Sequence, residues 1–141
     1  MTASCRRLRG YIESGLSQEP VALDVRNCKN YLRQAGAPFI PFVAVPLSKL
    51  SVSGSPKNFM DTDTVSGNCV ARHFCGDCSS PIYVMVAGAS DTAYVASGKL
   101  DVTNHQQPKC NGWTSMRHAC VSLTGGAPQE EMDSGLQPEV V

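Results

Sequence analysis

The C-x-x-C turn at Cys75-Gly76-Asp77-Cys78 constrains the fold of this chain more than any other feature of its sequence. Two cysteines separated by two residues can direct their thiolates at one tetrahedral metal ion, and Gly76 offers the backbone freedom that a tight turn needs. Apolar runs at residues 69–74 and 82–86 flank the turn and predict a hairpin whose tip a metal could pin. Because one such pair cannot close a metal site, the remaining ligands must come from elsewhere in the chain.

Length and charge limit the classes of function that the chain can serve. With 141 residues, it fits one domain, which we place at 1–123, followed by a Gly/Pro/Glu-rich and loosely ordered tail at 124–141. Twelve basic and twelve acidic residues cancel, so no electrostatic footprint for nucleic acid or an anionic membrane is present. No run approaches the roughly 20 apolar residues that cross a bilayer. We therefore expect a small-molecule partner, no nucleic acid and no membrane.

The cysteines indicate the compartment. The chain has seven, an odd number, and its N-terminus carries no apolar segment of the kind that directs secretion. This combination predicts free thiols and metal ligands in a reducing, cytoplasmic environment. We expect Cys69, Cys110 and Cys120 to be small buried apolar residues.

Short apolar segments separated by turn residues predict a mainly β protein with little helix. One helix is expected at residues 28–35, ended by Gly36. Pro41 interrupts the apolar run 38–46, which predicts a sheet edge or a bulge there and makes residues 39–45 a candidate interface for a homo-oligomer, although an ordinary core strand is the simpler interpretation. The other expected strands lie at residues 10–12, 21–25, 50–53 and 92–97.

Three segments resemble the glutathione-dependent formaldehyde-activating enzymes, a zinc-binding family with a β-tent fold. Residues 66–83 read S-G-N-C-V-A-R-H-F-C-G-D-C-S-S-P-I-Y and are similar to a long motif of that family. The apolar run 36–46 and the G-K-L-D stretch at 98–101 are similar to two further elements. The resemblance implies the β-tent fold and zinc binding over most of the chain.

This sequence departs from the family at its cysteine clusters. The family's C-H-C-x-x-C cluster falls over residues 26–31, where Arg26 and Tyr31 replace two thiolates and Cys28 remains. A guanidinium cannot ligate zinc, so the resemblance does not carry the family's catalytic zinc to this chain. The family's first C-x-C falls over residues 5–7, where Arg7 replaces the second thiolate. The resemblance therefore leaves Cys5, Cys75 and Cys78 for one zinc ion per chain.

Three protein ligands in place of four suggest a zinc ion with an open position. Such an ion could act as a Lewis acid on a carbonyl or enolate oxygen, with Arg7 placed to stabilise negative charge. A closed structural site is the competing interpretation, with Cys28, His73 or Cys69 as the fourth ligand. Tyr31, His105 and His118 are acid or base candidates by residue type alone. We assign catalytic roles to Arg7, Tyr31 and His73, although the strand pattern of His73 is also that of a surface residue.

Three functions follow as hypotheses. The preferred one is a diverged zinc enzyme acting on a small carbonyl-containing metabolite by lyase, aldol or isomerase chemistry, with a role in secondary metabolism. The second is the family's own carbon–sulfur lyase activity on glutathione and formaldehyde. The third is a non-catalytic binding module that zinc only stabilises.

Overall fold

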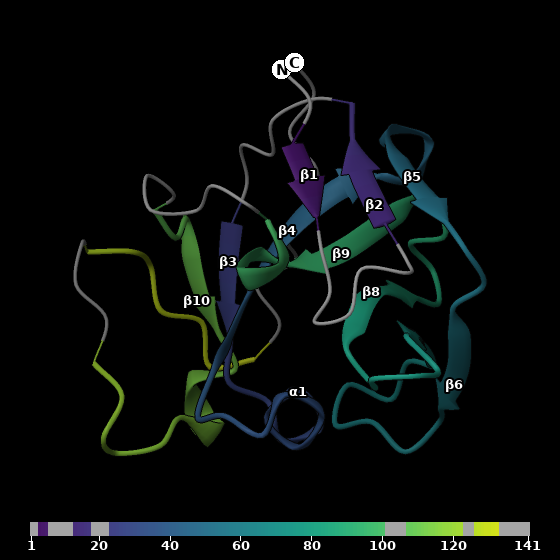
Figure 1. The fold of residues 1–141 in the computed structure, drawn as a ribbon. Coiled ribbons are helices and arrows are strands. Elements are labelled where there is room, and N and C mark those ends of the chain that lie inside the picture. Colours follow the sequence, from purple (N-terminus) through teal and green to yellow (C-terminus); the bar gives the residue numbers. More distant parts are fainter. Residues whose placement is uncertain (1–2, 6–12, 18–22, 101–106, 123–125, 133–141) are drawn as a thin grey trace.

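The computed structural model describes residues 3–5, 13–17, 23–100, 107–122 and 126–132, and within them it forms two β-sheets and one α-helix. A three-stranded sheet, in the order β1-β2-β5, lies on one side of a seven-stranded sheet with the order β10-β3-β4-β9-β8-β7-β6, and α1 lies on the other side (Figure 1). All pairings are antiparallel except that of β10 with β3. The mainly β fold class predicted from the sequence is confirmed.

The elements have the following bounds. The small sheet consists of β1 (Ala3–Cys5), β2 (Glu13–Leu16) and β5 (Leu50–Ser53). The large sheet consists of β3 (Leu23–Arg26), β4 (Ile40–Pro46), β6 (Lys57–Asp61), β7 (Val70–Phe74), β8 (Pro81–Val86), β9 (Thr92–Ala96) and β10 (Cys110–Gly112). The helix α1 is Lys29–Ala35, and short 3-10 turns occur at Leu47–Lys49, Ser97–Lys99 and Thr114–Met116.

The large sheet is buried on both faces at its centre. Val43 and Val45 of β4 pack in a cluster with β2, β3 and β9, whereas Phe42 and Ala44 pack with α1, β7 and β8. Successive strand residues point to opposite faces, so a strand covered on both sides needs an unbroken apolar run. This explains why residues 42–45 are apolar throughout.

The expectation that Pro41 marks a sheet edge or bulge is wrong. β4 lies inside the sheet, between β3 and β9, and Pro41 is in register with Val25. Pairing with β9 begins only at Phe42, so proline stands where β4 has a neighbour on one flank only. Residues 39–45 are therefore a core strand and not an exposed interface.

The predicted helix and most predicted strands are present. Gly36 ends α1 with φ 62°, and its N–H donates to the Leu32 carbonyl at 2.8 Å. The strand expected at residues 10–12 lies outside the described residues. β6 was not predicted, because its sequence Lys-Asn-Phe-Met-Asp shows no alternation of apolar and polar residues.

Part of the expected tail pairs with the sheet. The backbone of residues 126–132 runs beside β10, where the N–H of Trp113 donates to the Met132 carbonyl at 2.8 Å and the N–H of Glu130 to the Asn111 carbonyl at 2.9 Å. This segment is thus fixed by hydrogen bonds, in contrast to the loose order expected of 124–141. The domain boundary itself stays a prediction.

The helices of the described residues are too short to cross a bilayer.

Replacing Gly36 by alanine tests the helix end. No atom lies within 4 Å of a Cβ added at Gly36, so the cost comes from the left-handed backbone alone. We expect the Gly36→Ala variant to lose about 1 kcal/mol of unfolding free energy in urea denaturation. Gly98→Ala is the matched control, because it also has an open Cβ position but no positive φ. Equal stability of the two variants would contradict this account of the cap.

Candidate functional site

The C-x-x-C turn joins β7 to β8 and forms a compact knuckle, by which we mean residues 75–80. The N–H of Cys75 donates to the Ser80 carbonyl, and the N–H of Ser79 donates to the Cys75 carbonyl, both at 2.9 Å. The N–H of Asp77 donates to Cys75 Sγ at 3.4 Å. Such a bond stabilises negative charge on sulfur, as zinc ligation requires. Cys75 is buried and Cys78 is partly exposed, so the knuckle presents its two thiols at different depths.

Gly76 is needed in this turn because it has no side chain, and not for its backbone freedom, as the sequence suggested. Its φ is not positive, whereas the left-handed residue of the knuckle is Ser79, with φ 61°. A Cβ at residue 76 would lie 2.8 Å from Cε of Lys57, whose methylene groups lie against the turn. Glycine therefore lets the Lys57 side chain of β6 cover the knuckle.

The small sheet brings β1 toward the knuckle. Cys5 is in register with Ser14, which is in register with Val52, and Val52 packs against the cluster of Cys75 and Ile82. The backbone of Cys5 is thus two strands from a residue that touches the knuckle, although the Cys5 side chain lies outside the described residues. Among the described side chains, no three His, Cys, Asp or Glu residues gather as a metal site.

Arg7 and His105 also lie outside the described residues. His118 is exposed beyond the last 3-10 turn and lines none of the cavities described below.

His73 is half buried on β7 and stacks on Tyr83 of β8, with the ring centroids 4.1 Å apart. Burial lowers the pKa of His73. Its Nδ1 is buried and has no hydrogen-bond partner among the described residues. His73 does not line the groove described below, which is bordered by its strand neighbours Arg72 and Phe74.

Most of residues 24–31 form a buried cluster that contains an ion pair. Arg26 is buried, with Nε 3.2 Å from Oδ2 of the fully buried Asp24 and its guanidinium 5.9 Å from the Tyr94 ring centroid. The Asn27 side chain is also fully buried and donates to Asn111 Oδ1 at 2.6 Å and to the Gly112 carbonyl at 2.8 Å. A fixed cation thus stands in the segment where the resemblance would place a metal-binding thiolate.

Cys28 and Tyr31 lie in the same buried cluster. Both line a cavity of about 30 Å³ with Arg26, Arg72 and Trp113. Burial raises the pKa of the Cys28 thiol, and burial raises the pKa of Tyr31 to about 12. Cys28 therefore resists ionisation, and Tyr31 stays protonated at neutral pH.

These residues do not fit a zinc ion. The cluster offers one thiol with a raised pKa, whereas zinc binds thiolates, and a guanidinium beside it repels a cation. Cys28 packs with α1 and does not join Cys75 and Cys78, which belong to another cluster. The knuckle, in contrast, fits a zinc ion by donor type and by its N–H to sulfur bond.

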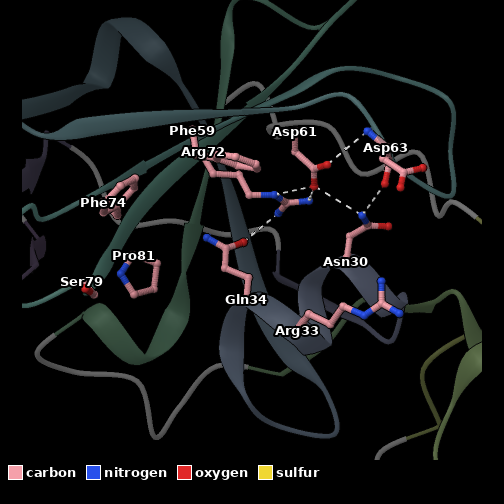
Figure 2. Close-up of a pocket in the computed structure, with 10 residues that line it drawn as sticks. All are labelled: Asn30, Arg33, Gln34, Phe59, Asp61, Asp63, Arg72, Phe74, Ser79 and Pro81. Atoms are coloured by element: carbon pink, nitrogen blue, oxygen red, sulfur yellow. Dashed lines mark hydrogen bonds and ion pairs between the residues drawn. The ribbon is translucent and has the colours of Figure 1, made fainter.

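A groove of about 440 Å³ opens between α1 and the strands β6 and β7 (Figure 2). Arg72 crosses its floor and donates to Asp61 Oδ2 from Nε at 2.9 Å and from Nη2 at 2.7 Å, and to Gln34 Oε1 from Nη1 at 2.7 Å. Asn30 donates to Asp61 Oδ2 at 3.3 Å and to the Asp63 carbonyl at 2.9 Å. This network fixes α1 against the sheet and leaves the groove with a rigid polar wall.

The groove also has an apolar side, and it ends at the knuckle. Phe59, Phe74 and Pro81 form its apolar side, and Ser79 of the knuckle closes that end. Sequence reasoning missed this site because Asp61 and Phe59 belong to the unpredicted strand β6. A partial signal was present in Arg72, a lone charge within an apolar strand run, which must find a partner when buried.

Thiol labelling tests the assignment of Cys28. Contrary to expectation, Cys69 and Cys120 are exposed and Cys110 is partly exposed, whereas Cys28 is buried with a raised pKa. We expect iodoacetamide to label Cys28 at least about tenfold more slowly than Cys69 at pH 8, because both burial and protonation oppose attack. Mass spectrometry of peptides gives the rates, and labelling in urea is the control, where the two rates should converge. Fast labelling of folded Cys28 would show an accessible thiolate.

Comparison with known proteins identifies the family. The family profile described as glutathione-dependent formaldehyde-activating enzyme matches residues 1–116. No curated protein matches the chain. The matched region contains the knuckle, the groove and the ion-paired cluster, and it covers most of the chain. The protein therefore belongs to the family of glutathione-dependent formaldehyde-activating enzymes.

Proposed function

We propose that the protein is an enzyme that binds a small carbonyl-containing metabolite in the groove and holds a single zinc ion with Cys5, Cys75 and Cys78. The observation that carries the proposal is the groove itself, which ends at Ser79 and Pro81 beside the knuckle. A cavity of this size with an apolar side and a few fixed polar groups has the character of a small-molecule site. When bound, zinc with three thiolates would supply a Lewis acid for a carbonyl or enolate oxygen.

The charges of the groove favour a neutral substrate. Arg33 and Arg72 line it together with Asp61 and Asp63, so the formal charges cancel. Arg72 already donates three hydrogen bonds to Asp61 and Gln34, which holds its guanidinium in place. The apolar side would exclude water from the carbon skeleton of the substrate. Arg33, which lies away from Ser79 and Pro81 (Figure 2), would bind a polar group of the substrate.

The reaction class is proposed as lyase, aldol or isomerase chemistry, with Arg7 stabilising developing negative charge. A cytoplasmic place in secondary metabolism belongs to the same proposal. Tyr31, with its pKa of about 12, could serve only as a proton donor or hydrogen-bond donor from the neighbouring cavity.

The family's own activity is the second candidate. Its support is the family match and the retention of Cys28. The buried Arg26–Asp24 pair speaks against it, because this pair stands where the resemblance would place part of the reactive zinc cluster. Incubation with formaldehyde and glutathione separates the two functions, and we expect no formation of the thiol adduct above the uncatalysed rate.

Metal analysis tests the zinc assignment. We expect one zinc ion per purified chain and almost none in Cys78→Ser, because the variant lacks one of the two knuckle thiolates. Cys28→Ser is the matched control and should keep one zinc ion, since Cys28 packs in another cluster. Two zinc ions per chain, or zinc loss in Cys28→Ser, would overturn the assignment.

Truncation of the groove tests the substrate site. Small neutral carbonyl compounds are screened by their effect on the thermal midpoint, and turnover is measured for those that bind. We expect Phe59→Ala to raise KM about tenfold, which corresponds to about 1.4 kcal/mol of lost apolar contact. Met132→Ala is the control, because Met132 is equally exposed but lies away from the groove. Stabilisation of the fold by zinc without binding of any such compound would instead support a non-catalytic module.

A further inference from the structure

The strand β6 forms one edge of the large sheet and exposes apolar side chains on both faces. It pairs with β7 on one side, and among the described residues no strand pairs with its other side. Phe59 is 59% exposed and its neighbour Met60 is 53% exposed. Because successive strand residues point to opposite faces, each face of this edge exposes one large apolar side chain. Free edges of this kind invite pairing with another strand.

The opposite edge of the sheet is covered. β10 is bordered by residues 126–132, which bridge Asn111 to Gln129 and accept or donate backbone hydrogen bonds along the strand. Figure 1 shows β10 and β6 at opposite sides of the molecule. The chain thus protects one edge with its own backbone, and in the described structure it leaves β6 open.

The hydrogen-bond pattern shows which backbone groups of β6 face outward. The N–H of Ala87 donates to the Cys69 carbonyl at 2.9 Å, so the backbone N–H and C=O groups of Cys69 point toward β8. Along a strand these groups point to the two neighbouring strands in turn, residue by residue. By this alternation the N–H and C=O groups of Val70 and Arg72 point toward β6, where Arg72 is in register with Phe59. The N–H and C=O groups of Asn58 and Met60 must therefore point away from the sheet.

We propose that β6 pairs antiparallel with β6 of a second copy of this chain about a twofold axis at Phe59. In this register Asn58 of each copy is opposite Met60 of the other, and the outward groups form about four hydrogen bonds between the copies. Phe59 is opposite its own counterpart. Lys57 is opposite Asp61 of the second copy, and because the axis is twofold this charge pair occurs twice.

The charge pattern of β6 distinguishes a second copy from other occupants. In the sequence Lys-Asn-Phe-Met-Asp, the two end residues carry opposite charges at equal distances from Phe59. A strand of this pattern complements itself when it runs antiparallel. Lysine on an edge strand can also prevent pairing, but in this register Asp61 of the second copy is opposite Lys57. The Lys57 ammonium would reach that carboxylate by turning away from Gly76, against which its methylene groups lie in the single chain. Asp61 also accepts hydrogen bonds from Arg72 of its own chain, so Lys57 of the second copy would be the second cation beside this carboxylate.

The pairing would join the two grooves. Lys57, Phe59 and Asp61 lie on one face of β6, and Phe59 and Asp61 line the groove. Each copy would add its Phe59 beside the apolar side of the other copy's groove. The association does not depend on zinc or on the reaction, so it can fail while the proposed function stands.

Replacing Met60 by proline tests the pairing. Proline removes an N–H that points away from β7, so the sheet of each chain keeps its hydrogen bonds while the edge loses one donor per copy. We expect the wild-type chain to form dimers in sedimentation equilibrium, and Met60→Pro to raise the dimer dissociation constant at least about tenfold. An unchanged circular dichroism spectrum verifies the fold. A wild-type chain that is monomeric from micromolar to millimolar concentration would overturn the proposal, and so would dimers that Met60→Pro leaves intact.

Two further variants test the register should Met60→Pro fail to fold. Lys57→Glu places like charges opposite Asp61 and should weaken the dimer, whereas Lys49→Glu makes the same charge change at an exposed site elsewhere and should not. Phe59→Cys is made in a background of Cys69→Ser and Cys120→Ser, which removes the two exposed cysteines. It should form a disulfide-linked dimer under mild oxidation, because the Cα atoms of residue 59 in the two copies would be about 4.5 Å apart. Asn58→Cys should not, since residue 58 faces residue 60. Equal crosslinking at both positions would contradict the register.

Discussion

Burial of the large sheet on both faces is the constraint on which the rest of this structure depends. Val43 and Val45 face the small sheet, while Phe42 and Ala44 face α1, so one strand stabilises two packed layers. Both clusters combine residues far apart in sequence, and removal of apolar surface from water is the main source of their stability. Because β4 and β9 occupy this centre, the hairpin of β7 and β8 lies to one side of the sheet, and Gly76, Asp77 and Ser79 of its knuckle are exposed.

The site combines two kinds of rigidity. The knuckle is fixed by its own backbone hydrogen bonds, which follow from a few neighbouring residues. The groove is fixed by the ion pair of Arg72 and Asp61, with 2.7 Å between Nη2 and Oδ2, together with Gln34 from α1. Nε and Nη2 of Arg72 both donate to Oδ2 of Asp61. Because the pair is mostly buried, it holds its geometry well, since each group would incur a large desolvation cost without the other.

The cluster at residues 24–31 is organised around a buried ion pair. Arg26 brings a permanent positive charge, and the fully buried Asp24 neutralises it. Hydrogen bonds from Asn27 to Asn111 and Gly112 tie this cluster to β10. The two charges of the pair cancel, but a guanidinium has no lone pair with which it could bind a metal ion. Any reactive chemistry is therefore expected at the knuckle and the groove.

The sequence by itself determined the fold class, the hairpin around Cys75 and Cys78 and the helix ended by Gly36. It also showed Arg26 and Tyr31 at positions where the resemblance would place thiolates. These features are local, since they depend on residue spacing, on turn chemistry or on ligand type at single positions. Only the tertiary structure decided that Pro41 lies in a central strand, that Ser79 and not Gly76 adopts the left-handed backbone, and that Asp61 meets Arg72. Those outcomes depend on which strands become neighbours, and strand order results from the burial of the whole chain, which no short segment encodes.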